Sequence, residues 1–236
     1  MHGCDMDIFL DISFDDVVQQ NAQSDDKFSP VLNSVSKMLR RCNAFNNILV
    51  IRSARCPLVK FDHVQSGLKC DLSMNNRLAL QNTRLIKLLC DVDPRIQTLM
   101  YNVRYWAKLK QLAGNPSGGL RVTNYALTMM VIFYLQQLDT PMLPSIEQLA
   151  KRAVDAGETC TIEGWDCSFS SDLDKLRSIA ASNTDSLRHL LAGFFSFYAT
   201  FDLSSYVLCP RTGIAVDIAA FSSCMKEDER FAQFKV

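Results

Sequence analysis

Three aspartates of this chain have the spacing to bind divalent cations. Asp5 and Asp7 stand two residues apart in the run DMDIFLDI at positions 5–12, where apolar residues occupy every second position. Because side chains alternate between the two faces of a β-strand, both carboxylates leave one face, about 7 Å apart. Asp71 lies on another predicted strand, and a neighbouring strand could bring its carboxylate into the same cluster.

Three carboxylates clustered on a rigid sheet repel one another unless cations neutralise them. Two divalent ions roughly 3.5–4 Å apart can bind the attacking hydroxyl and the leaving pyrophosphate of a phosphoryl transfer. The competing interpretation is that the D-x-D run is the solvated face of an edge strand. Phe9, an apolar residue on the acidic face, and the third strand-borne aspartate both count against that simpler interpretation.

A small α+β unit is expected to position these aspartates. The pattern predicts a helix at 31–43 and strands at 5–12, 48–52, 58–61 and 68–72. Residues 15–30 follow neither period and are expected to form a polar loop. The unit therefore contains an antiparallel or mixed sheet with one helix.

After residue 75 the composition changes to that of a helical domain. Helices are predicted at 77–89, from Asp93-Pro94 to about 112, at 124–136, after the capping box that begins at Ser145, and at 185–200. Residues 157–182 show no clear period and are expected to be irregular. The prediction is an α+β fold with domains at 1–75 and 76–236.

Composition and charge place the chain among folded globular proteins. Its 236 residues hold 25 basic and 25 acidic side chains and are 48% apolar, which excludes disorder for most of the chain. Acids dominate residues 1–30 and bases dominate 31–110, a layout that suits an anionic substrate and a divalent cation in one cleft. On charge alone, scattered solvated bases explain the layout better. No run of about 18 uncharged apolar residues occurs, so no membrane partner is predicted.

Several ordered segments resemble the non-canonical poly(A) polymerases and terminal uridylyltransferases, a family of DNA polymerase β-like nucleotidyltransferases. They are HGCDMDIFLDI, GLKCDLSMNNRLALQNTRLIKL, DPRIQTLMYNVRYWAKLK, VTNYALTMMVIFYLQ, TIEGWDCSF and SLRHLLAGFFSFYATFDL, and together they span about residues 1–215. The resemblance is strongest to the branch that extends a spliceosomal small nuclear RNA, and next to the mitochondrial poly(A) polymerases. It implies a partial nucleotidyltransferase palm at 1–75 and a helical poly(A) polymerase-associated domain at 76–236.

The resemblance also implies roles for the three aspartates. Asp5, Asp7 and Asp71 match the catalytic metal-binding triad, which holds Mg²⁺ (or Mn²⁺). Asp71 would in addition help to deprotonate the RNA 3′-hydroxyl.

Four further polar residues match nucleotide-binding positions of the family. Asn82 and Thr83 would contact the ribose and nearby phosphates. Arg104 and Lys108, four residues apart and hence on one helical face, would hold the triphosphate. Without the resemblance, the first two are an exposed polar helix turn and the other two a solvated stripe.

The last two implied nucleotide-binding residues are Asn124 and Tyr125. The base would stack on Tyr125, which supplies affinity without choosing among bases. Asn124 would touch the base or the phosphates. An ordinary core aromatic is the competing interpretation of Tyr125.

Two elements of the family pattern are missing. A Gly-Ser turn that holds the β- and γ-phosphates should precede the first aspartate, but only four residues precede Asp5. The C-terminal segment in which a histidine helps to select uracil is also absent, and His2, His63 and His189 fit no such position. We therefore expect a fragment of a larger enzyme.

The resemblance implies a template-independent RNA 3′-terminal nucleotidyltransferase. Uridylyl transfer from UTP to RNA 3′ ends is preferred, and adenylyl transfer from ATP is the alternative. A truncated, non-catalytic RNA-binding module is the alternative from another class. The expected compartment is the nucleus, with the mitochondrion or cytoplasm as alternatives.

Overall fold

The computed structural model describes residues 6–11, 29–54, 56–74, 76–114 and 121–227. The chain divides into two compact units, Met1–Asn82, here called the sheet unit, and Thr83–Val236, the helical unit. The division falls within α2 (Arg77–Val92). The predicted domain boundary after residue 75, which lies just before this helix, stays a prediction.

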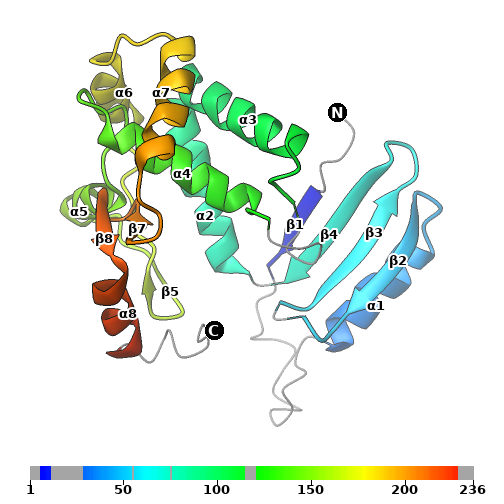
Figure 1. Cartoon of the computed structure of the whole chain (residues 1–236). Coiled ribbons are helices and arrows are strands. Elements are labelled where there is room, and N and C mark those ends of the chain that lie inside the picture. Colours follow the sequence, from blue (N-terminus) through cyan, green and yellow to red (C-terminus); the bar gives the residue numbers. More distant parts are fainter. Residues whose placement is uncertain (1–5, 12–28, 55, 75, 115–120, 228–236) are drawn as a thin grey trace. The chain divides into compact units, whose positions relative to one another are not determined.

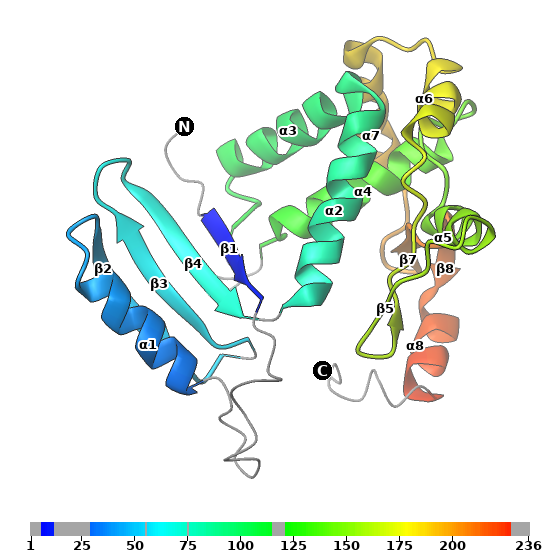
Figure 2. The ribbon, with the colours of Figure 1, turned by 180° about the vertical axis from the view of Figure 1, so that it is seen from behind.

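The sheet unit is a four-stranded mixed sheet with one helix against one face, as Figures 1 and 2 show from opposite sides. Its elements are β1 (Met6–Leu10), α1 (Ser29–Arg40), β2 (Phe45–Ile51), β3 (Leu58–His63) and β4 (Leu68–Met74). In the order β1-β4-β3-β2, β1 runs parallel to β4, and the other pairs are antiparallel. The predicted α+β class, helix and strands are confirmed. Most of the predicted polar loop at 15–30 lies outside the described residues, but its last two residues begin α1.

Alternation along the strands decides which face of the sheet packs against α1. Leu32 of α1 meets Val59 and Phe61 of β3 and Cys70 and Met74 of β4, and all five are almost completely buried. Because neighbouring residues of a strand point to opposite faces, the residues between these apolar ones lie on the other face of the sheet. That second face, which we call the open face, carries the polar residues of the strands.

The helical unit consists of helices and two short hairpins. Its elements after α2 are α3 (Pro94–Leu109), α4 (Asn124–Gln137), α5 (Ile146–Asp155), β5 (Thr161–Ile162), β6 (Trp165–Asp166), α6 (Leu173–Ala181), α7 (Leu187–Thr200), β7 (Tyr206–Cys209), β8 (Ile214–Asp217) and α8 (Ile218–Glu227). The predicted starts at Asp93 and Ser145 are confirmed, since both side chains accept N-cap hydrogen bonds. None of the described helices combines the length and hydrophobicity that crossing a bilayer requires.

The prediction that residues 157–182 are irregular is wrong in part. Residues 161–166 form the β5–β6 hairpin, and α6 begins after Asp172, whose carboxylate accepts a hydrogen bond from the backbone N–H of Lys175. In α6 only Leu176 and Ala180 are buried. Two buried positions are too few to show a helical period in the sequence.

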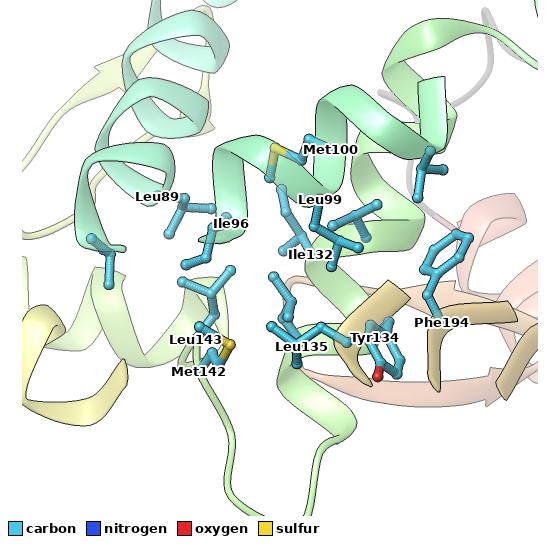
Figure 3. Close-up of a cluster of buried hydrophobic side chains, with 14 of the residues drawn as sticks. Leu89, Ile96, Leu99, Met100, Ile132, Tyr134, Leu135, Met142, Leu143 and Phe194 are labelled. Carbon is cyan, nitrogen blue, oxygen red and sulfur yellow. The ribbon is translucent and has the colours of Figure 1, made fainter. Parts of the chain in front are cut away.

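One apolar core packs helices α2 to α7 together (Figure 3). Leu99 and Met100 of α3 face Ile132 of α4, and Phe194 of α7 lies beside Tyr134 of α4, with ring centroids 5.8 Å apart. Most of α4 is apolar on every side, which explains why it lies in the middle of the unit. The first turns of α3 and α4 are thereby fixed to a rigid support.

This unit contains a close packing contact between α7 and α4, and an ion pair at the start of α3. A side-chain carbon added at Gly193 of α7 would overlap the Tyr134 hydroxyl, so the Tyr134 side chain of α4 packs directly against the backbone of α7 there. At the start of α3, the Arg95 guanidinium donates to both carboxylate oxygens of Asp93, at 2.9 and 2.8 Å, and to the backbone carbonyl of Asp185, at 2.8 Å. Hydrogen bonds from Arg95 lower the pKa of Asp93.

Candidate functional site

Two of the three predicted metal ligands are neighbours in the sheet. Asp7 of β1 and Asp71 of β4 are direct partners in the parallel register. Paired residues of adjacent strands point to the same side, here on strands about 4.8 Å apart. This side is the open face, because Cys70, the neighbour of Asp71, is buried against α1. Asp5 lies outside the described residues.

The structure adds Lys60, which the sequence did not single out. Lys60 of β3 is paired with Asp71 in the antiparallel register, and its Nζ lies 2.6 Å from Asp71 Oδ2. Lys60, Asp71 and Asp7 therefore form one row across the open face. Only the register between the strands reveals this row, because the sequence around Lys60 contains no pattern that predicts it.

A second polar group on the open face is neutralised within itself. Asp62 of β3 is paired with Lys69 of β4, with a carboxylate oxygen 3.6 Å from the ammonium. Asn47 donates from Nδ2 to the other oxygen of Asp62 at 2.7 Å. Asp62 is thus a partnered structural carboxylate, in contrast to Asp7, for which no ion pair with a described residue is found.

The fit of a divalent cation can be tested against these residues. No group of three or more His, Cys, Asp and Glu side chains with metal-site geometry occurs among the described residues. Mg²⁺ is commonly bound through one or two carboxylates, with waters and substrate phosphates completing its shell. Asp7 and Asp71 fit that requirement, and the ion would compete with Lys60 for Asp71.

The start of α2 is tied to the end of β1. Arg77 Nη2 lies 3.0 Å from Asp11 Oδ1, and both residues belong to the sheet unit. Asn82 and Thr83 follow on α2, and both are exposed, as a nucleotide-contacting role requires. Asn82 closes the sheet unit and Thr83 opens the helical unit.

The predicted basic pair lies on the exposed face of α3. Arg104 and Lys108 are one helical turn apart and exposed, whereas Leu99, Val103 and Ala107 on the opposite face are buried. Neither Arg104 nor Lys108 forms an ion pair within the part of the chain that the structure describes. Two uncompensated cations on one helix face form a binding surface for an anion.

The remaining predicted pair opens α4. Thr123 caps this helix, and Asn124 and Tyr125 are its first two residues. Tyr125 is 50% exposed, so the alternative of an ordinary core aromatic is not supported, although partial burial raises the pKa of its hydroxyl. The unpaired N–H groups of a first helical turn favour anions.

The ends of α3 and α4 that carry these residues are joined locally. Ala113 and Val122 form a parallel bridge, and the Val122 N–H donates to the Leu112 carbonyl at 2.9 Å. The last turn of α3, which includes Lys108, therefore lies at the same end of the helix pair as the first turn of α4. The helical unit offers cations and a half-exposed aromatic ring together, whereas the sheet unit offers carboxylates.

Comparison with known proteins shows which proteins this chain resembles. Residues 1–91 match the family model described as "Poly(A) RNA polymerase, mitochondrial-like, central palm domain". The chain is 39% identical to the "Speckle targeted PIP5K1A-regulated poly(A) polymerase" of Danio rerio, covering 94% of this chain and 31% of that protein. It is 35% identical to the human "Poly(A) RNA polymerase, mitochondrial", covering 89% of this chain and 38% of that protein. The chain thus spans about a third of the length of these relatives.

Solved structures agree with the sequence comparison. The structure of mtPAP in complex with UTP superposes with a TM-score of 0.80 at 35% identity, over 91% of this chain and 47% of that one. A mutant of the Cid1 poly(U) polymerase bound to MgATP gives a TM-score of 0.74 at 26% identity, over 92% of this chain and 63% of that one. These proteins share the mixed sheet and the following helices. The chain is therefore similar in sequence and fold to non-canonical poly(A) polymerases and terminal uridylyltransferases, over about a third of the length of the curated relatives.

Proposed function

We propose that this chain supplies the metal-binding and nucleotide-binding residues of a template-independent RNA 3′-terminal nucleotidyltransferase. The observation that carries the proposal is the direct pairing of Asp7 with Asp71 on the open face of the sheet. Two carboxylates fixed on adjacent strands repel each other, and the single ammonium of Lys60 compensates only one of them. A divalent cation relieves this repulsion, and the nucleotide triphosphate is its natural co-ligand.

In this proposal Asp7 and Asp71 hold Mg²⁺ (or Mn²⁺), with Asp5 as the third ligand that the family resemblance implies. The bound ion supplies Lewis-acid activation and neutralises charge on the triphosphate. Asp71 accepts the proton of the RNA 3′-hydroxyl at a carboxylate oxygen, while Lys60 holds Oδ2. The 3′-oxygen then forms a bond to the α-phosphorus as the bond to pyrophosphate breaks.

The helical unit would bind the nucleotide. Arg104 and Lys108 hold the triphosphate and stabilise the charge that develops on the leaving pyrophosphate. Asn82 and Thr83 contact the ribose and nearby phosphates. Tyr125 stacks on the base, and the backbone N–H groups of Asn124 and Tyr125, which start α4, add donors for phosphate oxygens.

The proposal also concerns which nucleotide, UTP or ATP, is the substrate. Stacking on Tyr125 is tolerant of base identity, and so we propose that the described residues bind UTP and ATP with similar affinity. Uridylyl transfer is supported by the family resemblance in the sequence. Adenylyl transfer is supported by the relatives that are named poly(A) polymerases. The solved complexes of mtPAP with UTP and with ATPγS are consistent with a tolerant pocket.

The decisive experiment pairs two aspartates of the open face. Asp71→Asn is expected to abolish nucleotide addition to a 5′-labelled RNA and to remove the Mg²⁺-dependent part of UTP and ATP binding measured by calorimetry. Asp62→Asn is the matched control, because that carboxylate is already partnered by Lys69 and Asn47. Wild-type transfer by Asp71→Asn contradicts the proposal. RNA binding without transfer or triphosphate binding in the unmutated protein favours the non-catalytic module instead.

The nucleus is the proposed compartment. It is supported by the resemblance to the small nuclear RNA branch and by the "Speckle targeted" relatives, whereas the mitochondrial relative keeps the mitochondrion as the alternative. Fluorescence microscopy of the tagged full-length protein, with nuclear and mitochondrial markers, distinguishes the two.

A further inference from the structure

One exposed face of α3 combines aromatic and basic side chains. Tyr101, Arg104, Tyr105 and Lys108 follow the i, i+3, i+4, i+7 spacing that places residues on one side of a helix, and all four are exposed. We call these four residues the α3 stripe. The opposite side of α3 is buried in the core of the helical unit. The stripe is therefore presented on a rigid helix.

The two tyrosines of the stripe are unusual for exposed aromatic residues. Tyr101 is 66% exposed and Tyr105 52%, and their rings are nearly parallel, with an interplanar angle of 6° and centroids 6.1 Å apart. Tyrosine is intermediate between the buried and the exposed residue types, so what distinguishes these two rings is their stacking on one exposed helix face. The pair presents two aligned ring faces on the surface of the helix.

The positive charge of α3 indicates which kind of ligand this surface binds. The helix contains no acidic residue from Pro94 to Leu109, and along its exposed face Arg104 falls between the two tyrosines and Lys108 one turn after Arg104. Neither cation forms an ion pair with a described residue. Aromatic rings interleaved with cations are the arrangement that binds single-stranded nucleic acid, because the bases stack on the rings and the phosphates meet the cations.

We propose that Tyr101 and Tyr105 form a stacking platform for bases of the single-stranded RNA substrate. The inference rests on the proposed function for the identity of the RNA, and it adds two positioning residues that neither the metal side nor the triphosphate side requires. A stack tolerates any base, which suits an enzyme that extends RNA without a template. Because Arg104 and Lys108 are assigned to the triphosphate, they contact RNA phosphates beside the platform only when no nucleotide is bound, which is the condition of the RNA titration.

The test measures RNA binding separately from nucleotide binding. The probe is a 5′-fluorescein-labelled single-stranded oligouridylate or oligoadenylate, titrated with the full chain in a fluorescence anisotropy assay. Replacing both tyrosines by leucine, a strong helix former, is expected to weaken binding about 5- to 150-fold for each base that no longer stacks, whereas replacing both by phenylalanine keeps the rings and the affinity. Tyr206→Leu, which removes an exposed tyrosine of β7, is the control and leaves the affinity unchanged.

Salt dependence separates stacking from charge. In the double leucine variant, the slope of log affinity against log salt concentration is expected to stay unchanged. In Arg104→Gln and in Lys108→Gln, the magnitude of this slope is expected to fall by about 0.7 for every phosphate that is no longer neutralised. Photocrosslinking of a 4-thiouridine, placed at successive positions of the single-stranded RNA, provides a direct readout. The crosslink is expected on the peptide that contains the α3 stripe, and it should disappear in the leucine variant.

Several outcomes overturn the platform. They are an absence of RNA binding by the unmutated chain, an unchanged affinity in the leucine variant, and equal losses in the leucine and phenylalanine variants. An unchanged affinity would assign the tyrosines to a protein-contact surface. A parallel loss of UTP and ATP affinity would mean that the rings bind the incoming nucleotide. If the unmutated chain binds RNA but shows neither nucleotide transfer nor Mg²⁺-dependent triphosphate binding, the proposed function is refuted, whereas the proposed platform is not.

Discussion

Replacing Gly193 by alanine is expected to destabilise the helical unit, although the same change normally stabilises a helix. Glycine inside a helix costs about 0.5–1 kcal/mol relative to alanine. At Gly193, however, the added methyl group would fall well inside the van der Waals contact distance of the Tyr134 hydroxyl. The Tyr134 ring is 4% exposed and packed against Phe194 and Phe197, so it has little room to move.

The magnitude follows from these opposing effects. Overpacking of a tight core costs about 1–3 kcal/mol, which leaves a net destabilisation of up to about 2.5 kcal/mol after the helix preference of about 0.5–1 kcal/mol is subtracted. If Tyr134 is first changed to phenylalanine, the nearest ring atom is Cζ at 3.3 Å, which requires only a small shift. In that background Gly193→Ala is expected to become neutral or to stabilise by up to about 1 kcal/mol.

Urea unfolding followed by tryptophan fluorescence measures this double-mutant cycle. Both tryptophans, Trp106 and Trp165, lie in the helical unit, so the signal reports on that unit alone. Ser196→Ala, at an exposed position of the same helix, is the control and should stabilise slightly. A destabilisation by Gly193→Ala that persists unchanged in the Tyr134→Phe background would refute the reasoning, because the two sites would then not be coupled.

Two further predictions concern charged groups. Lys60→Met removes the ammonium that competes for Asp71, and since a half-exposed ion pair is worth about 0.2–1 kcal/mol, Mg²⁺ affinity measured by calorimetry is expected to rise by up to about fivefold. Weaker Mg²⁺ binding would show instead that Lys60 orients the carboxylate. Asp93 has its pKa lowered by Arg95, so its contribution to stability is present above the ordinary pKa of 3.8 and is lost as the pH falls below it. Unfolding measured from pH 6 to about pH 2 should therefore be less pH-dependent in Asp93→Asn than in the unmutated protein, and equal slopes would contradict the assignment.

Local patterns in the sequence were sufficient for most elements of the fold. Alternation of apolar residues located β1, and the capping residues Asp93 and Ser145 located the starts of α3 and α5. The helix α6 was not predicted from the sequence, because its buried side consists of Leu176 and Ala180 alone. Elements that bury few residues leave little periodicity in the sequence.

The candidate site was predictable only where it depended on spacing within one element. The period of a strand predicted the open-face position of Asp7, but the neighbour relation between Asp7 and Asp71 depends on pairing between strands far apart in the chain. Lys60 was missed for the same reason. Tyr101 and Tyr105 were missed because aromatic residues at helical spacing are ordinarily part of a core, and only the exposure in the folded unit distinguishes them.

The parallel pairing of β1 has a consequence for shortened forms of the protein. β1 is an edge strand held by β4 alone, and the five most deeply buried residues of the sheet unit belong to α1, β3 and β4. A splice product without this strand would retain a helix-backed antiparallel meander, with the Lys60–Asp71 ion pair intact, but only one carboxylate of the pair. Such a product would lack the paired carboxylates on which the proposed divalent-cation site depends.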